Sequence, residues 1–401
     1  MANIRPFAAL RPKPELAARV CELPYDVMSS EEAREVAAGN PLSFLHVSKP
    51  EIDLPPGTDT YSPAVYAKGL ENFQRLINEG ALRQDSAPAF YLYRQIMGSH
   101  SQVGLVAAAS CDDYLKGIIR KHEFTRPDKE DDRVRHIETL NAQTGPVFLV
   151  YKAQEAMDAL VRTRTAAAPE IDFVARDGVR HSAWVLTDAA DLSLIGNTFA
   201  SLPCLYIADG HHRSAAAGRV FQSRNGTGHS GWFLSVIFPD SQVQILAYNR
   251  VLKDLNGMTP SSLLEKLSEI FTITPGGNGQ TRTKNLLGLY LAGQWNTLQF
   301  RAPGGSGIGG LDVSLLQDRV LSPLFGIHDP RTSKRINFVG GIRGTAELEK
   351  LVDSGEYACA FSMNPTSIQD LMDIADQGGI MPPKSTWFEP KLRDAMFSHM
   401  L

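Results

Sequence analysis

Short apolar runs alternate with amphipathic stretches along the whole chain. Residues 89–97 and 102–110 are two runs rich in strand-forming residues on either side of Gly98-Ser99, which predicts a pair of adjacent strands. Ser62-Pro63 predicts the start of a helix and Gly80 its end, because serine caps a helix, proline suits its first turn and glycine stops it. This mixture of strand and helix patterns predicts an α/β protein of mixed α+β type.

The pattern changes near Glu170, and this change defines the expected domains. A hairpin is predicted over residues 171–186, with its turn at Asp177-Gly178. The apolar run 205–208 predicts a short buried strand that leads directly into a helix of small residues. We therefore expect three parts, namely an N-terminal α/β region that contributes pocket loops, a central core and a C-terminal α/β region, over residues 1–165, 166–256 and 257–401.

Composition narrows the classes of partner. The chain of 401 residues carries 40 Lys plus Arg against 44 Asp plus Glu, a net charge of −4, which gives no support for binding to nucleic acid or to a membrane surface. The N-terminus has no apolar stretch of signal-peptide length, and no run approaches the roughly 18 apolar residues of a membrane span. We expect a cytoplasmic protein. Its four cysteines are far apart, which disfavours a disulfide framework or a cysteine zinc site.

The main candidate site is the polar loop after the strand predicted at 205–208, and it consists of Asp209-Gly210-His211-His212-Arg213-Ser214. The start of a helix presents free backbone N–H groups, and a glycine lets a ligand approach them closely. A guanidinium can bind two phosphate oxygens, and histidines can donate hydrogen bonds or move protons near neutral pH. The loop therefore predicts a phosphate-binding site.

These residues also carry a resemblance to known proteins. The loop is similar to the Gly-x-x-Arg phosphate-binding motif of the ParB/sulfiredoxin superfamily, in the Asp-Gly-His-His-Arg form found in free-serine kinases. The whole chain resembles a bacterial family of unknown function that is often encoded near phosphoserine-pathway enzymes. The segments that carry this second resemblance are Arg5-Pro6-Phe7, Pro24-Tyr25-Asp26-Val27, Arg120-Lys121-His122-Glu123, Gly145-Pro146-Val147-Phe148, Ala208 to Arg213, Tyr248-Asn249-Arg250 and Pro383-Lys384-Ser385-Thr386. The resemblance implies a ParB/sulfiredoxin-like central unit between N- and C-terminal α/β extensions.

The loop and the resemblance together lead to an expected activity. It is nucleotide-dependent phosphoryl transfer to or from a small hydroxyl substrate, above all serine or O-phosphoserine, with Mg²⁺ and ATP or ADP as cofactors. Asp209 and His211 are expected to be catalytic, and Asp209 is expected either to accept the hydroxyl proton or to support the Mg²⁺ bound to the nucleotide. The phosphates are expected to be bound by Gly210, His212, Arg213 and Ser214.

The catalytic base is expected outside the loop, because the free-serine kinases use a glutamate that precedes the motif. Glu123 is the first candidate and Glu22 the reserve. Glu123 lies in a polar cluster that can hold an anion while a carboxylate acts as base, and His122 and Arg133 from this cluster are expected to bind the substrate. The alternative for the cluster is a solvated, salt-bridged loop.

Further candidates lie near both ends of the chain. Asp26 is a candidate pocket residue after Pro24-Tyr25, and Asn249-Arg250 at a strand end are candidates for binding a substrate carboxylate. Pro383-Lys384-Ser385-Thr386 is similar to the end of a P-loop, but proline has no N–H for a phosphate, which excludes a Walker A loop. Lys384, Ser385 and Thr386 still offer a positive charge and two hydroxyls to a phosphate.

Two other functions stay open. The first is a metal-dependent hydrolase of phosphoserine or another phosphate ester, with Asp209, His211 and His212 as metal ligands. The second is a protein that binds a nucleotide as a regulatory signal without catalysis. The letters Gly305-x-Gly307-x-x-Gly310 match a dinucleotide-binding fingerprint, but no βαβ unit is evident around them, so a flexible connection is expected there.

Overall fold

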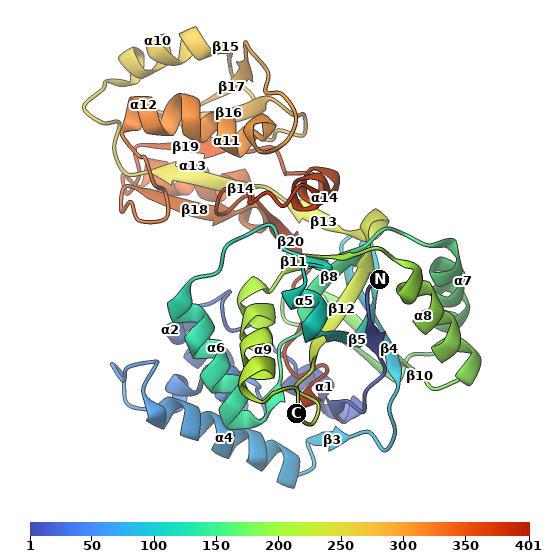
Figure 1. Cartoon of the computed structure of the whole chain (residues 1–401). Coiled ribbons are helices and arrows are strands. Elements are labelled where there is room, and N and C mark those ends of the chain that lie inside the picture. The colour runs from blue at the N-terminus through green and yellow to red at the C-terminus, as the bar shows by residue number, and fades with distance from the viewer. The chain divides into compact units, whose positions relative to one another are not determined.

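The computed structural model describes all 401 residues, and the chain forms two compact units. The first unit comprises residues 1–243 together with 390–401, and the second comprises residues 244–389. The C-terminal segment therefore returns to the unit in which the chain begins, as the red end of the chain in Figure 1 shows. None of the helices is both long enough and apolar enough to cross a membrane.

A nine-stranded mixed sheet is the centre of the first unit. Its strands are β1 (Ile4–Arg5), β4 (Phe90–Met97), β5 (His100–Ser110), β6 (Ile119–Arg120), β8 (Val147–Tyr151), β9 (Ile171–Val174), β10 (Arg180–Leu186), β11 (Leu205–Asp209) and β12 (Trp232–Pro239). They lie in the order β6-β11-β8-β12-β5-β4-β10-β9, with β1 paired to β5. Only β6 with β11 and β8 with β12 are parallel neighbours. The predicted mixed α+β class is confirmed.

Helices surround this sheet, and short strand pairs extend the unit. The helices are α1 (Ala17–Val20), α2 (Ser30–Ala37), α3 (Leu45–Ser48), α4 (Pro63–Asn78), α5 (Cys111–Leu115), α6 (Pro127–Leu140), α7 (Glu155–Thr165), α8 (Ala189–Ser201) and α9 (His211–Ser223). The short strands are β2 (Leu10–Pro12) with β3 (Leu82–Gln84) and β7 (Ala142–Gln143) with β21 (His399–Met400). The pairing of β7 with β21 anchors the C-terminal segment in the first unit.

Small side chains allow α9 to pack closely on both of its sides. Ala217 belongs to the apolar core under the sheet, whereas Ala216 and Val220 pack against Ile137 of α6. A methyl group added to Gly218 would lie 3.2 Å from the ring of Tyr114 in α5. The helix that follows the polar loop is therefore fixed between the sheet and α6, and its first residues are held in a constant position.

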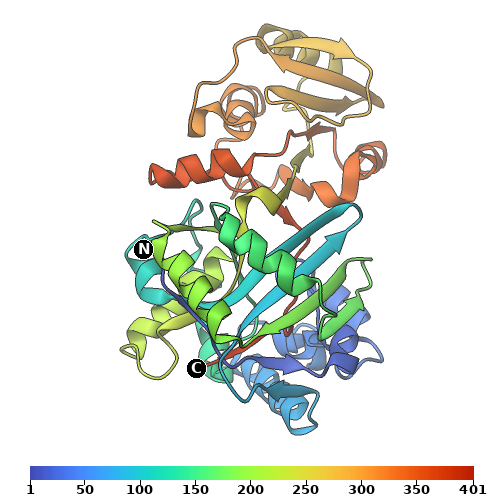
Figure 2. The same ribbon diagram turned by 90° about the vertical axis from the view of Figure 1, so that its right-hand side faces the viewer.

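The second unit contains a six-stranded antiparallel sheet in the order β15-β17-β16-β19-β14-β18, together with the pair β13-β20. The strands are β13 (Gln244–Leu246), β14 (Tyr248–Leu252), β15 (Phe271–Pro275), β16 (Leu286–Leu291), β17 (Gln294–Phe300), β18 (Ile336–Gly340), β19 (Cys359–Ser362) and β20 (Trp387–Glu389). The helices are α10 (Pro260–Ile270), α11 (Asp312–Leu316), α12 (Ser322–Phe325), α13 (Gly344–Asp353) and α14 (Ile368–Asp376). Figure 2 shows these helices packed around the strands of their own unit.

The two units differ from the three parts expected from the sequence. The expected boundary after residue 165 lies inside the first unit, because β10 pairs with β4 along its whole length and joins both sides of that boundary in one sheet. The expected boundary after residue 256 lies inside the second unit, because β14 pairs with β18 and β19. Sequence periodicity does not reveal pairing between distant strands, which explains both differences.

Candidate functional site

The site forms where two parallel neighbouring strands end. Leu205 and Tyr206 of β11 pair in register with Ile119 and Arg120 of β6. Because the strands run in the same direction, the segments that follow them emerge at the same edge of the sheet. The loop that contains His122 and Glu123 therefore lies beside the loop that opens α9.

Gly210 makes the turn between β11 and α9. Its φ of +93° lies in the left-handed region, which other residues rarely adopt. As the N-cap residue it has no side chain to accept hydrogen bonds from the first N–H groups of the helix. The N-terminus of α9 is thus open to an anionic ligand, and the helix dipole favours negative charge at this position.

His122, Glu123 and His211 form a cluster at this edge. Their ligand atoms, one from each side chain, all lie within 4.8 Å of one another. The imidazole rings of His122 and His211 meet edge to face with centroids 4.5 Å apart, and these residues are only 2% and 6% exposed. His122, which the sequence analysis placed in substrate binding, is thus packed against His211 of the motif.

Both histidines of the cluster are neutral at physiological pH. Burial lowers the pKa of His122 to about 4. Burial, and then the neighbouring His122, hold the pKa of His211 well below its usual value, although Asp209 acts in the opposite direction. Neutral imidazoles can accept protons, donate hydrogen bonds or bind metal ions, whereas imidazolium cannot bind a metal.

Asp209 forms an ion pair with Lys391, whose Nζ lies 3.2 Å from Oδ2. Oδ1 accepts a hydrogen bond from the N–H of Gly210 at 2.9 Å. Burial by itself would raise the pKa of the Asp209 carboxyl, but Lys391 and Arg213 outweigh it and hold the pKa well below the usual range. A carboxylate with both oxygens engaged and its charge compensated does not fit the expected role of a magnesium ligand.

Arg213 connects the loop to a neighbouring turn. Its Nη1 donates a hydrogen bond to the carbonyl of Pro146, and Nη2 lies 3.9 Å from Oδ2 of Asp209. The side chain is 10% exposed, and its Nε has no hydrogen-bond partner. A Cβ on Gly210 would lie 3.0 Å from this Nε. Arg213 thus holds the loop in shape and retains one donor for a ligand.

His212 points toward the neighbouring loop. Its Nε2 accepts a hydrogen bond from the backbone N–H of Arg126 at 3.0 Å, so the proton of the neutral ring is on Nδ1. Burial lowers the pKa of His212, which keeps this acceptor available at neutral pH. His212 therefore fixes the loop that carries His122 and Glu123.

Ser214 does not face the expected phosphate. Its side chain is fully buried, and its hydroxyl donates a hydrogen bond to the carbonyl of His211 at 3.0 Å. The reserve base, Glu22, also has a partner, because its Oε1 accepts a hydrogen bond from Ser43 Oγ at 2.6 Å. A serine hydroxyl commonly donates to a carbonyl of the preceding helical turn, as that of Ser214 does. The position of Ser214 in the motif therefore does not show that it contacts a ligand.

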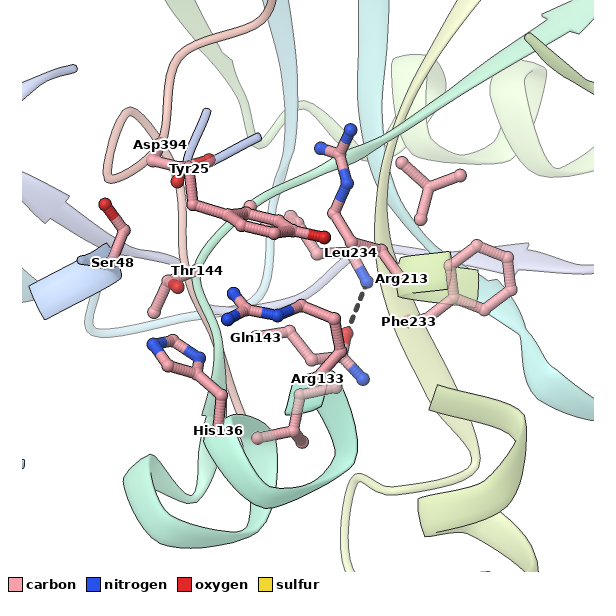
Figure 3. Close-up of a pocket in the computed structure, with 13 residues that line it drawn as sticks. Tyr25, Ser48, Arg133, His136, Gln143, Thr144, Arg213, Phe233, Leu234 and Asp394 are labelled. Carbon is pink, nitrogen blue, oxygen red and sulfur yellow. Dashed lines mark hydrogen bonds between the residues drawn. The ribbon is translucent and has the colours of Figure 1, made fainter. Parts of the chain in front are cut away.

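Arg213 also lines a small pocket whose walls combine apolar and polar side chains. Tyr25, Arg133 and Asp394 converge on it from different parts of the chain, as Figure 3 shows. The guanidinium of Arg133 lies 3.7 Å from the centroid of the Tyr25 ring and 2.6 Å from Asp132 Oδ2. The enclosed volume of about 30 Å³ has room for a water molecule but not for an amino acid or a nucleotide. Arg133, which was expected to bind the substrate, therefore lines this small pocket together with Arg213.

Asp394, which lines this pocket, has a carboxyl in an unusual environment. Its Oδ1 is buried without a hydrogen-bond partner, and a Cβ on Gly145 would lie 2.8 Å from it. Burial raises the pKa of Asp394 to about 7, with Asp26 adding to this effect and Arg213 opposing it. Asp26 itself is exposed, and its charge acts on both Arg213 and Asp394.

The remaining expected residues lie in the second unit, and their polar groups are used there. The buried guanidinium of Arg250 donates hydrogen bonds to the carbonyls of Tyr248 and Lys384, and burial lowers its pKa to about 10. Asn249 Oδ1 accepts from the N–H of Met363 at 3.0 Å, and Ser385 Oγ donates to the carbonyl of Pro382 at 2.6 Å. Lys384 and Thr386 were also expected to bind a phosphate. Lys384 is exposed and Thr386 is half-buried.

The sequence analysis missed Lys391, Asp394 and Gly145. Lys391 and Asp209 are 182 positions apart, and no motif connects them. Gly145 belongs to a segment that carries the family resemblance, which was a usable signal. The two C-terminal residues gave none, because a single lysine or aspartate in a polar tail is usually solvated.

The chain is similar to one protein family and to several solved structures. A model of the family described as "Protein of unknown function (DUF1015)" matches residues 4–314. No curated protein matches the sequence. Among solved structures, a free serine kinase variant in complex with AMP has a TM-score of 0.38 and 14% identity, covering 71% of this chain and 87% of that chain.

Two further solved structures are similar to the same degree. A conserved hypothetical protein from Pyrococcus furiosus has a TM-score of 0.36 and 14% identity, covering 73% of this chain and 93% of that chain. SbnI with a C-terminal truncation, from Staphylococcus aureus, has a TM-score of 0.38 and 11% identity, covering 72% and 85%. At these TM-scores, the functional argument rests on the site itself.

Proposed function

The chain belongs to a family of proteins of unknown function (DUF1015), and we propose that it transfers a phosphoryl group between a nucleotide and a small hydroxyl substrate such as serine or O-phosphoserine. One observation carries this proposal. One edge of the sheet brings together the open N-terminus of α9, two cations and a carboxylate. The cations are Arg213 and Lys391, which both lie beside Asp209, and the carboxylate is that of Glu123. Phosphoryl transfer requires groups that neutralise phosphate charge next to a group that accepts the hydroxyl proton.

The phosphates would bind at the start of α9. Backbone N–H groups after Gly210 would donate to phosphate oxygens, and the free Nε of Arg213 would add one more hydrogen bond. Mg²⁺ would enter with the nucleotide as part of the substrate. Asp209 would hold Lys391 toward the phosphates instead of binding the metal, because its carboxylate is already engaged.

Glu123 is the better candidate for the base. A general base works best when its pKa lies near the working pH. The pKa of Asp209 is strongly lowered, which makes that carboxylate a weak base. In the forward direction the substrate oxygen attacks the terminal phosphorus, its proton passes to Glu123, and the P–O bond to the departing nucleotide breaks. His211 would orient the hydroxyl through its neutral ring, and exposed Asp26 would bind a substrate ammonium group.

The hydrolase alternative has a weaker basis. His212 is turned to the backbone of Arg126, so Asp209, His211 and His212 do not converge as metal ligands. A nucleotide-binding regulator would use the same phosphate site without Glu123. The regulator does not account for a proton acceptor beside the open N-terminus of α9.

Phosphorus NMR of the full chain distinguishes these functions. The protein is incubated with Mg²⁺, ATP or ADP, and serine, and then with O-phosphoserine and the nucleotide product. A phosphoserine signal that grows at the expense of the nucleotide, and that falls at least about 100-fold in Glu123→Gln, would support the proposal. Glu138→Gln, which changes an exposed glutamate of α6, is the matched control. Free phosphate alone would indicate the hydrolase, and line broadening without turnover the regulator.

A further inference from the structure

His122, Glu123 and His211 at this sheet edge form a group of side chains that could hold a metal ion. His122 and Glu123 follow β6, and His211 opens α9 directly after β11. The parallel pairing of the two strands fixes the starting points of both segments, so the three side chains are brought together by the sheet and not by a mobile loop alone. Their ligand atoms lie within 4.8 Å of one another.

Three of the four histidine nitrogens in this cluster are buried without a hydrogen-bond partner. Neither ring nitrogen of His122 and not Nε2 of His211 makes a hydrogen bond, although all three atoms are buried. Leaving a buried polar atom unpaired costs roughly 1–3 kcal/mol, so such atoms generally have a partner in the working protein. Three unpaired nitrogens in two touching rings point to a shared ligand at their centre.

We propose that His122, Glu123 and His211 bind a first-row transition-metal ion such as Zn²⁺, Fe²⁺ or Co²⁺. Two imidazoles and one carboxylate are a donor set typical of these ions, whereas Mg²⁺ prefers oxygen ligands. Ligand atoms bound about 2.1 Å from one ion are roughly 3.0–3.4 Å apart, so binding requires the side chains to close by about an ångström.

The metal site goes beyond the proposed phosphoryl transfer and does not depend on it. Glu123 cannot accept a proton while it ligates an ion, so the bound transition metal would suppress the proposed transfer. Binding is therefore measured directly, without reference to turnover. A failure of either proposal then leaves the other intact.

Cobalt(II) absorption of the full chain tests the site. The purified protein is treated with a chelator, dialysed and titrated with Co²⁺, whose visible absorption reports the ligands and coordination number. We expect one equivalent of Co²⁺ to bind with intensified d–d absorption, to be displaced by Zn²⁺, and to resist a large excess of Mg²⁺. His122→Ala, Glu123→Gln and His211→Asn should each weaken binding at least about tenfold.

Two controls make the test decisive. His328→Asn removes an exposed histidine outside the cluster and should leave Co²⁺ affinity unchanged. Glu123→Gln keeps the size of the side chain, and thermal unfolding of the metal-free variant checks that the fold is preserved. Binding that is equally tight in the three cluster variants, or the absence of a bound Co²⁺ spectrum in the parent protein, overturns the proposal. Zn²⁺ should also raise the Tm of the parent but not of His211→Asn.

Discussion

The guanidinium of Arg213 lies against the backbone of Gly210, where an added Cβ would be only 3.0 Å from Nε and 3.2 Å from Cζ. The glycine and the arginine of the motif therefore serve one geometry. Gly210 supplies the left-handed turn and the space, and Arg213 fills that space and ties the turn to Pro146. The motif spacing fits this packing as well as the proposed contact with a phosphate.

Replacing Gly210 with alanine should separate these two contributions. Gly210→Ala has to accept a φ of +93° and to displace Arg213, so we expect a loss of about 2 kcal/mol of unfolding free energy and at least tenfold weaker nucleotide binding. The control is Gly178→Ala, which has a φ of +79° but no atom within 4 Å of the added Cβ. Its loss should be limited to about 1 kcal/mol of backbone strain, with unchanged binding. Equal effects of both variants in urea unfolding and nucleotide titration would contradict the packing argument.

The ion pair between Lys391 and Asp209 predicts a pH-dependent stability. Because the folded-state pKa of Asp209 is lowered, its contribution is present above the unfolded pKa of about 3.9 and is lost as the pH falls below it. Lys391→Met should therefore reduce the unfolding free energy by about 1 kcal/mol at neutral pH and by less near pH 3.

Urea unfolding between pH 3 and 7 measures this dependence, with values of pH chosen about one unit apart. Lys116→Met is the matched control, because Lys116 pairs with Asp112 on an exposed helix face. It should show no measurable change with pH. A Lys391→Met variant whose deficit is the same at every pH would show that the lysine acts through packing alone.

Local patterns predicted much of the fold correctly. The hairpin of β9 and β10 with its Asp177-Gly178 turn and the helix α4 after Ser62-Pro63 are both present. Each is determined by residues close in sequence, which is why pattern reasoning reaches it. Ser62 is placed correctly as the N-cap, but its hydroxyl makes no hydrogen bond.

Long-range pairing defines what the sequence could not predict. Residues 244–256 were expected to belong to the central core, yet β13 in this segment pairs with β20 in the second unit. In the candidate site, the Asp209 loop was found because five polar residues and one glycine are contiguous in it. The contribution of Lys391 and the union of His122 with His211 depend on strand order, which no local pattern encodes.

Asp394 predicts a second pH effect of the opposite sign. Burial raises the folded-state pKa of its carboxyl to about 7, and Asp26 adds to this increase. Arg213, Arg133 and Arg393 act in the opposite direction. The folded state therefore binds a proton that the unfolded state releases near pH 4, and stability falls as the pH rises from about 4 to 7. Asp394→Asn cannot ionise and should remove this decline.

The expected size of the decline is about 2 kcal/mol between pH 5 and pH 8 for the parent protein relative to Asp394→Asn. Chemical unfolding at these two values of pH gives the comparison. Asp112→Asn, which removes a half-exposed carboxylate, controls for the change in net charge. Parallel pH profiles of the parent and Asp394→Asn would show that Asp394 is ionised throughout, held by its three arginines.

His212 predicts a protected amide in the neighbouring loop. The N–H of Arg126 donates to Nε2 of His212 at 3.0 Å, so His212→Phe, which keeps a ring but removes the acceptor, should increase hydrogen exchange of that amide at least about tenfold. His328→Phe should leave it unchanged. The pKa of His212 is lowered by burial, so the parent protein should keep the protection at pH 7 and lose it in acid, where protonated Nε2 becomes a donor. Exchange at Arg126 that is fast in the parent, or equally slow in His212→Phe, would mean that the loop bearing Glu123 is held by other contacts and that the second histidine of the motif has a different role.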